Sequence, residues 1–402
     1  MKITKITIEN FKSIKKIELS KLSNLNMIYG LNNSGKSNLL KFIELLFSKK
    51  YIEGGHVSYD RSRFDFDDFA SEKEKTANFW DGIIENAEYI FHKNDRSTPI
   101  KFNATLEVDK NELSGIENIQ DFITEFNIDG NCIITIEGEI ISLSTQTAQI
   151  KLNKTSIISG DTSREIYTKE RSEYFSDIDE TKILRQNGYQ IYTDLLGVFN
   201  DCVLLLDNDR YFNTEYADNI SLDPLTPRTF NNWFHNLSLD QTRRDRFLSI
   251  VKEISLFKAS GDAHFQENEK NSPIHDNLRF EFGKIANTIE VYLSNSNSQV
   301  FPLSNFGTGI QQILYILAKI AERKPKIILI EEIELNLSPT YQFELIQHFN
   351  HTIIGEKPEE RKAFQLFFTT HNPALCIYDH FIVYKITING NGESSALKTG
   401  KE

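Results

Sequence analysis

A glycine-rich segment near the start of this 402-residue chain has the composition and spacing of a phosphate-binding loop. Residues 30–37, Gly-Leu-Asn-Asn-Ser-Gly-Lys-Ser, fit the pattern G-x-x-x-x-G-K-[ST] without deviation. The glycines let the backbone curl so that successive N–H groups face an anion, and the helix that follows directs its positive end to the same point. We expect Lys36 to reach the β- and γ-phosphates of a nucleotide and the Ser37 hydroxyl to ligate Mg²⁺.

Two carboxylates follow a short apolar run late in the chain. Residues 327–330 are all apolar, as in a buried strand, and Glu331 and Glu332 come directly after them. In a parallel sheet such strand ends converge beside a phosphate loop. One carboxylate can then hold the Mg²⁺ shell while the next polarises a water for attack on the γ-phosphate. From their order along the strand, we expect Glu331 to serve the metal and Glu332 the water.

A second glycine-rich turn contains Ser304, Gly307 and Gly309, and an amphipathic helix is predicted after it. A serine, two glycines and a free helix N-terminus can bind an anion. The chain then holds two phosphate binders, and one nucleotide needs both only if they come from different copies. A capped structural helix is the alternative interpretation of this turn.

A single histidine, His371, comes just after a run typical of a buried strand. A neutral imidazole at that place can hydrogen-bond the γ-phosphate and sense its loss. A lone histidine can also be structural, but its position one strand after the carboxylates favours the functional interpretation.

The elements that must position these residues follow from the hydrophobic periodicity. A strand at 25–29 and a helix at 38–47 flank the phosphate loop, and mixed polar helical patterns cover 163–200 and about 226–258. The other elements with a clear pattern are strands at 2–9, 100–108, 131–142, 147–153, 202–207, 326–330 and 364–369, terminal strands, and helices at 310–323 and 339–350.

Five segments, taken in chain order, resemble those of ABC-type ATPases: Asn10-Phe-Lys-Ser13, the Gly30–Ser37 loop, the Ser304–Gln312 turn, Ile327–Glu332 and Thr370-His-Asn-Pro373. The chain is most similar to the branch with SMC, RecF and OLD-family proteins, often grouped with AAA-type ATPases. The resemblance covers roughly residues 1–47 and 300–375. It implies an α/β fold, an ABC-type P-loop ATPase head with a mixed central sheet, an antiparallel β subdomain and a mainly helical insertion.

The resemblance also implies four segments. They are an N-terminal ATPase lobe at 1–110, an antiparallel β extension at 111–160, the helical insertion at 161–284 and a C-terminal ATPase lobe at 285–402. The same resemblance implies that the chain binds ATP and Mg²⁺ and hydrolyses ATP to ADP and phosphate. Glu331 stands where many ABC proteins have aspartate, a change that the OLD-like branch tolerates.

Residue roles carry over from the same resemblance. In that family the signature serine and glycines of one subunit close over ATP held by the other, so a homodimer or higher homo-oligomer is expected. Ser304, Gly307 and Gly309 would make the contacts between copies. Lys36, Glu332 and His371 would be catalytic, and Ser37 and Glu331 would hold the metal. The nucleotide-binding residues within one copy would be Gly30, Asn32, Asn33, Ser34, Gly35, Lys36, Ser37 and Asn38, with Lys12 at the nucleotide edge.

The composition of the chain limits the kinds of partner and of site that it can have. The formal net charge of −12 argues against a broadly basic nucleic-acid binder, although a local basic patch around Lys15 and Lys16 or around Arg243 and Arg244 remains possible. The three cysteines form no CxxC pair, so neither a zinc site nor a disulfide framework is indicated. No signal peptide and no apolar run of roughly 18 residues is found, which predicts a cytoplasmic chain without a membrane span.

Three functions are compatible with these features. The leading hypothesis is an ATP-driven dimeric switch. OLD nucleases carry a Toprim domain after the ATPase, and here the chain ends soon after His371. We therefore expect control of a separate effector, a nuclease or toxin, in bacterial anti-phage defence. The alternative is a RecF- or SMC-like repair ATPase whose dimer clamps duplex DNA. A P-loop kinase is a third possibility that the distant carboxylates disfavour.

Overall fold

Two units make up the chain, and each is interrupted along the sequence by the other. Unit 1 consists of Met1–Leu205, Lys326–Leu329 and Ala363–Glu402, and unit 2 of Leu206–Pro325 and Ile330–Lys362. The four segments expected from the sequence stay a prediction beside this division. The computed structural model describes residues 1–47, 83–84, 87–113, 130–159, 162–168, 202–208, 233, 240–253, 279–285, 288–294, 300–302, 307–354, 364–377 and 381–399.

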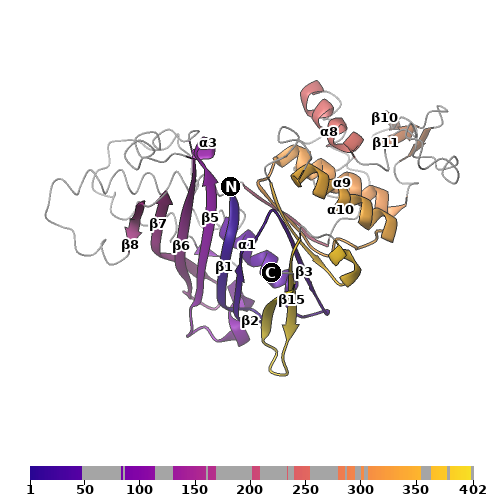
Figure 1. The fold of residues 1–402 in the computed structure, drawn as a ribbon. Coiled ribbons are helices and arrows are strands. Elements are labelled where there is room, and N and C mark those ends of the chain that lie inside the picture. Colours follow the sequence, from indigo (N-terminus) through magenta and orange to yellow (C-terminus); the bar gives the residue numbers. More distant parts are fainter. Residues whose placement is uncertain are drawn as a thin grey trace. The chain divides into compact units, whose positions relative to one another are not determined.

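One half of the sheet in unit 1 is antiparallel (Figure 1). Buried residues alternate with more exposed ones along its strands, as expected of a sheet with one covered face. The strands are β1 (Lys2–Phe11), β2 (Ile14–Ser20), β5 (Ile100–Asp109), β6 (Asn131–Ser142), β7 (Ala148–Ser159) and β8 (Thr162–Thr168), with the short β4 (Ile83–Ile84) beside β7.

The other half of the sheet carries the phosphate loop. Strand β3 (Leu25–Gly30) pairs in parallel with both β14 (Gln365–Thr370) and β15 (Ile382–Ile388). Strand β15 forms an antiparallel hairpin with β16 (Ser394–Thr399), which joins β2. Beyond β14 the order continues with β13 (Ile327–Ile330) and β9 (Val203–Leu206).

Helix α1 (Lys36–Phe47) follows the phosphate loop and closes the core of unit 1. Its apolar face is almost entirely buried, which explains why a short helix is stable here. The ring of Phe42 meets Phe11 of β1 edge-on at 4.9 Å and Phe102 of β5 at 6.1 Å. The helix is thereby fixed against strands from the N-terminal end of the chain.

Unit 2 is built around α9 (Thr308–Arg323), with α8 (Gln241–Glu253) and α10 (Pro339–Ile354). Helix α8 contacts α9, and Trp233 contacts both helices. Its indole N–H donates to Glu322 on α9 at 2.9 Å. Its ring packs against Phe247 on α8, with 5.9 Å between the ring centroids. A separate antiparallel sheet consists of β10 (Arg279–Ile285), β11 (Thr288–Ser294) and β12 (Val300–Pro302).

Most elements predicted from periodicity are confirmed, but two segments differ. The helical pattern read from residue 163 onward is wrong for its first part, because β8 pairs with β7 there; threonine, isoleucine and tyrosine suit a strand. Strand β2 was not anticipated. It forms a hairpin with β1, in which Asn10 near the end of β1 and Lys12 in the turn have positive φ values of 63° and 49°.

The described part of the chain contains no helix with the length and apolar composition that a membrane crossing requires. Cys132 and Cys202 are both buried. Burial raises the pKa of the Cys132 thiol to about 11, so this group stays protonated and unreactive at neutral pH.

Candidate nucleotide-binding site

The phosphate loop runs from the end of β3 to the first turn of α1, as the sequence predicts. Asn33 and Gly35 adopt positive φ values of 60° and 101°, and the Leu39 N–H bonds to the Gly35 carbonyl. A side chain at Gly30 would lie 2.3 Å from the Ile386 carbonyl oxygen, so only glycine fits there. Helix α1 begins at Lys36, two residues earlier than expected, which brings its positive end into the loop itself.

Lys36 and His371 meet across this loop, although they are 335 residues apart in sequence. The Lys36 ammonium donates to the carbonyl oxygens of Gly30 and Leu31, both at 2.9 Å, and lies 3.2 Å from His371 Nδ1. His371 directly follows β14, and β14 is the parallel neighbour of β3. The parallel pairing therefore brings together the two residues that the sequence assigned to the γ-phosphate.

The remaining loop residues present polar groups to the same region. Asn32 and Asn33 are exposed, and Ser37 is half-buried on the first turn of α1. The Ser34 hydroxyl is buried, and within the described residues it has no hydrogen-bond partner. Buried hydroxyls are nearly always hydrogen-bonded, so a phosphate oxygen is a natural partner for this one.

Asn38 and Lys12 take positions that the motif alone does not specify. The Asn38 amide donates to Ser13 Oγ at 2.9 Å. Both backbone polar groups of Lys12 have a partner. Its N–H donates to the Ile90 carbonyl, and its carbonyl oxygen lies 2.7 Å from His92 Nδ1. The Lys12 ammonium lies over the ring of Phe11, 5.5 Å from its centroid.

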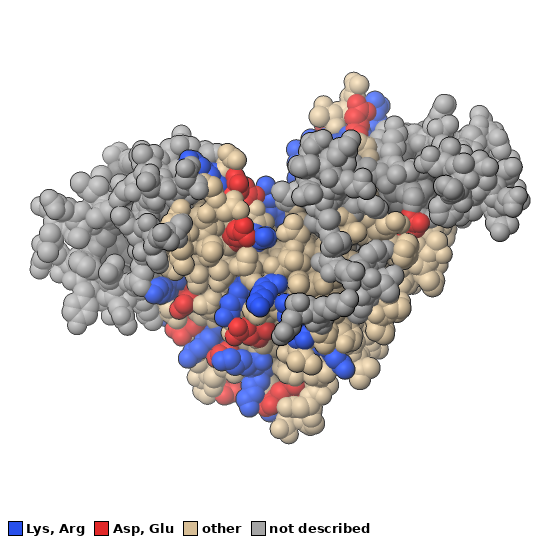
Figure 2. Space-filling model, in the orientation of Figure 1, with Lys and Arg blue, Asp and Glu red and all other residues tan. Residues whose placement is uncertain are grey.

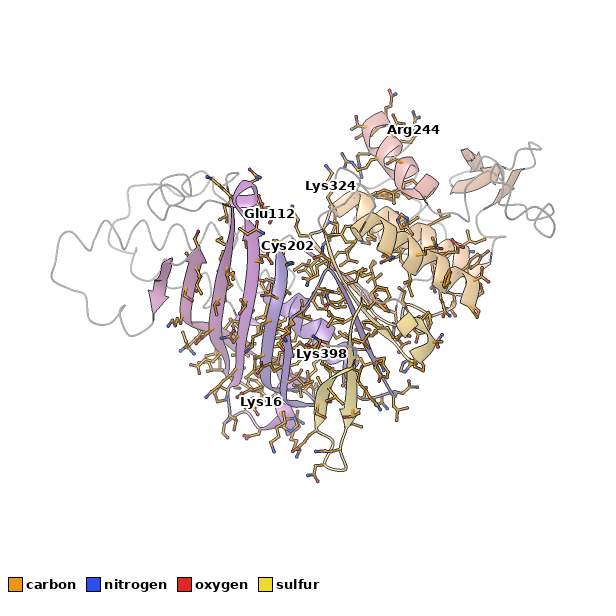
Figure 3. The ribbon with its side chains drawn as sticks, in the orientation of Figure 1. Lys16, Glu112, Cys202, Arg244, Lys324 and Lys398 are labelled. Carbon is orange, nitrogen blue, oxygen red and sulfur yellow. The ribbon has the colours of Figure 1, made fainter. Side chains whose placement is uncertain are left out.

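Strand β13, which leads to the two carboxylates, is anchored at its start. Lys326, the residue before β13, forms an ion pair of 2.8 Å with Glu112 on α3 (Lys110–Leu113), labelled in Figure 3. Burial alone raises the pKa of Glu112, but Lys326 and the amino group of Met1 bind its carboxylate, and the net effect lowers the pKa. The start of β13 is thus held by charge as well as by the sheet.

Glu331 and Glu332 follow β13 in unit 2 and differ in their surroundings. Glu331 is only 3% exposed, and its N–H donates to the Leu206 carbonyl at 2.9 Å. Glu332 has a φ of 44°, and so does Asn336 nearby at 54°. Left-handed non-glycine residues are costly and tend to occur at functional sites. The turn between them is closed by the Leu335 N–H, which donates to the Glu332 carbonyl.

The two glycines of the second turn are not equivalent. Gly307 is the N-cap of α9, with φ −56° and ψ 146°, and a Cβ there would have no described atom within 4 Å. A Cβ on Gly309 would lie 3.0 Å from the Tyr341 ring and 3.1 Å from the Asn336 carbonyl oxygen. Gly309 is therefore closely packed within one copy, whereas no described atom lies near a Cβ at Gly307. Ser304 lies outside the described residues.

The oxygen ligands available suit Mg²⁺. Ser37 offers a hydroxyl and Glu331 a carboxylate, and both are the hard donors that Mg²⁺ prefers. No cluster of three or more histidine, cysteine or carboxylate side chains able to hold a metal occurs in the described segments. Few protein ligands are expected for an ion held mainly by substrate phosphates and water.

The sequence analysis missed part of the phosphate-loop surroundings. Ser394 on β16 donates to Ser13 Oγ at 2.8 Å, next to Gly35. No motif marks Ser394, and it reaches the loop only because β16 pairs with β2.

Comparisons with known proteins agree with this geometry. The family model described as AAA ATPase domain matches residues 1–376. The chain is 22% identical over 387 residues to an ATP/GTP phosphatase of Helicobacter pylori, covering 92% of this chain and 85% of that protein. It is 23% identical over 386 residues to Endonuclease GajA of Bacillus cereus, covering 93% and 56%.

A shorter match, 29% identical over 119 residues, joins the chain to the DNA replication and repair protein RecF of Caldanaerobacter subterraneus subsp. tengcongensis, covering 30% of each. The matched stretches are less than two thirds of the length of RecF and of GajA. Among solved structures, the SMC head domain of Thermotoga maritima aligns over 100% of both chains, with 13% identity and a TM-score of 0.45.

The mixed sheet confirms the predicted α/β class, and the family match confirms an ATPase domain. The RecF and GajA relatives confirm the predicted branch. The chain belongs to the AAA ATPase domain family, whose model matches residues 1–376.

Proposed function

We propose that this chain binds and hydrolyses ATP as a head-to-tail homodimer and acts as a switch. The observation that carries the proposal is the 3.2 Å approach of Lys36 Nζ to His371 Nδ1 at the phosphate loop. A cation and an imidazole that converge where N–H groups also point can bind the γ-phosphate from two sides. The family match and the ATP/GTP phosphatase relative support the same chemistry.

Each of the proposed site residues has a distinct role in hydrolysis. Lys36 exchanges its bonds to the Gly30 and Leu31 carbonyls for bonds to the β- and γ-phosphates. Glu332 accepts a proton from the attacking water as the new bond to γ-phosphorus forms and the bond to the ADP oxygen breaks. Ser37 and Glu331 would hold Mg²⁺, which would neutralise part of the phosphate charge. His371 hydrogen-bonds the γ-phosphate and loses this contact when phosphate leaves.

A second copy completes the site in this proposal. The partner's Gly307 would approach the triphosphate with the free N–H groups at the start of α9. Support comes from the open space at Gly307, which no described side chain of the same copy fills. ATP then joins two copies, and hydrolysis separates them.

The conformation of Gly307 provides a clean test of this arrangement. Its φ and ψ suit any residue, and aspartate is a preferred N-cap, so Gly307→Asp should fold normally. The carboxylate would repel the partner's triphosphate. We expect Gly307→Asp to bind ATP but to lose ATP-dependent dimers, measured by light scattering, and to lose hydrolysis by on the order of 100-fold.

Gly307→Asn is the matched neutral control, and it should be impaired less than Gly307→Asp. Dimerisation and hydrolysis at the wild-type level in Gly307→Asp would show that Gly307 does not face the partner's nucleotide. Release of phosphate without any phosphorylated acceptor separates this function from that of a kinase.

The switch is proposed to control a separate effector, a nuclease or toxin, in bacterial anti-phage defence. Support comes from Endonuclease GajA, of which the matched stretch covers 56%. The experiment is affinity purification of Glu332→Gln from the native host with ATP, compared with Lys36→Ala. A nuclease or toxin that co-purifies only with Glu332→Gln supports the proposal. Equal recovery with both variants contradicts ATP-dependent control.

The second candidate is a RecF-like ATPase that clamps duplex DNA, and the RecF match favours it. Helix α8 carries Arg243, Arg244 and Arg246, with Arg244 labelled in Figure 3. On the visible face of unit 1, however, acidic and basic side chains are intermixed (Figure 2). In unit 1, Lys2, Lys5 and Lys16 are each paired with a glutamate. DNA affinity that falls steeply with salt would favour this candidate over the effector switch.

A further inference from the structure

The β15–β16 hairpin touches the phosphate loop at both of its glycines. Ile386 of β15 pairs with Gly30, and its carbonyl oxygen lies 2.3 Å from where a Gly30 Cβ would be. Ser394 of β16 places its Oγ 2.4 Å from the corresponding position on Gly35. The β15–β16 hairpin therefore contacts the phosphate loop near both of its ends, at Gly30 and at Gly35.

Ser394 also binds Ser13, whose hydroxyl lies against Gly35 as well. Its Oγ donates to Ser13 Oγ at 2.8 Å, and its N–H donates to the Ser13 carbonyl at 2.8 Å. Ser13 Oγ accepts a second bond from Asn38 on α1 at 2.9 Å. Both acceptor positions of the Ser13 hydroxyl are thus used, which fixes its orientation. Ser394 is 2% exposed, so water cannot readily replace it.

The turn that leads into Ser394 is itself held by charge. The Glu393 carboxylate accepts hydrogen bonds from Asn389 and from Lys93, both at 3.1 Å, and from Lys15 at 3.4 Å. The Asn389 amide and these two ammonium groups lower the pKa of Glu393 to about 2. Glu393 is therefore ionised at neutral pH, as its contacts with β2 and with the 92–94 segment require.

We propose that the β15–β16 hairpin holds the phosphate loop in its binding conformation, and that Ser394 is the positioning residue for Gly35. The inference rests on the proposed function, in which this loop binds ATP. A loop that is already ordered loses less conformational entropy when the triphosphate arrives. Ser394 itself touches Ser13 and Gly35, and acts on the nucleotide only through them.

The test compares Ser394→Ala with Ser395→Ala, which removes an exposed neighbouring hydroxyl that meets Thr387 at 3.0 Å. Binding of a fluorescent ATP analogue and steady-state hydrolysis are measured. Ser394→Ala should weaken binding and raise KM about five- to tenfold, with kcat within about twofold of wild type. Ser395→Ala should match wild type. In a Ser13→Ala background, Ser394→Ala should add nothing, because both hydroxyls act through one contact.

Unchanged nucleotide affinity in Ser394→Ala, or full additivity with Ser13→Ala, overturns the inference. Failure of the proposed function gives a different result, since wild type and Ser395→Ala would then not bind ATP either. If Ser394→Ala does not fold, Glu393→Gln tests the same support from the exposed turn. It should raise KM about twofold at low salt, and an unchanged KM overturns the inference.

Discussion

At the residue scale, the tautomer of His371 decides which of its two contacts is a hydrogen bond. Its Nδ1 lies 3.0 Å from the Gly30 carbonyl oxygen and 3.2 Å from Lys36 Nζ. The Lys36 ammonium can only donate a hydrogen bond, so Nδ1 would have to accept from it. The Gly30 carbonyl can only accept, so Nδ1 would have to donate to it. The two contacts are therefore alternatives. When Lys36 changes its hydrogen-bond partners, the contact available to His371 Nδ1 changes as well. The proposed role of His371 as a sensor of the γ-phosphate requires such a coupling.

Lys36 and Glu332 should separate binding from hydrolysis. Lys36→Ala removes the cation that the phosphates need, so we expect ATP binding to be abolished. Glu332→Gln removes the proton acceptor but not the phosphate contacts, so it should retain ATP, hydrolyse it on the order of 100-fold more slowly and accumulate as a dimer. Calorimetry, phosphate release and light scattering measure the three quantities. Normal hydrolysis by Glu332→Gln would mean that another group activates the water.

Lys319 on α9 gives a prediction for pH. Burial, with a smaller contribution from Arg323, lowers its pKa from 10.5 to about 8. Between these values the unfolded chain binds more protons than the folded one, so this group makes stability rise with pH across that window. Lys319→Met should raise the free energy of unfolding on the order of 2 kcal/mol at pH 7.

The gain from Lys319→Met should shrink above pH 8 and vanish near pH 10.5, as urea titrations at several pH values would reveal. The exposed Lys324 at the end of the same helix provides the control variant Lys324→Met. A pH-independent gain in Lys319→Met would indicate better packing as its cause.

At the element scale, one buried glutamine joins three parts of unit 1. Gln365, at the start of β14, accepts from the Ile3 N–H and donates to the carbonyls of Ile3 and Ser23, all within 2.8 Å. Gln365→Ala removes the side-chain partner of the N–H and carbonyl of the fully buried Ile3, and should lower the free energy of unfolding by about 2–4 kcal/mol. Gln146→Ala, in an exposed loop, is the control. An equal and small loss in both variants would contradict a structural role for Gln365.

The sequence predicts those elements whose pattern is long or bounded by a motif. Strand β3, helix α1 and the approach of His371 to the loop follow from a glycine motif and from parallel strand order. Strand β2 and the Ser394 contact could not be predicted in this way. The Ser394 contact depends on the pairing of β16 with β2, two segments far apart in the sequence, and such a pairing leaves no local signal. Strand β2 pairs with its neighbour β1, but the turn between them lacks the Asn-Gly or Asp-Gly sequence that marks a tight hairpin.

At the scale of the whole molecule, the residues proposed for the site belong to both units. Unit 1 holds the phosphate loop and His371, while unit 2 holds Glu332, Gly307 and Gly309. In unit 2, Gly309 contacts the Asn336 carbonyl and the Tyr341 ring, so the start of α9 and the turn after Glu332 form one packed piece. A partner that contacts Gly307 would therefore act on a piece that also carries the proposed base.

The most direct measurement is a structure of Glu332→Gln with ATP and Mg²⁺, solved by crystallography or cryo-electron microscopy. The account predicts each triphosphate between Lys36 of one copy and the partner's Gly307. A structure in which ATP lies on the Lys36 loop while the Gly307 turn of every copy points away from all triphosphates would contradict it.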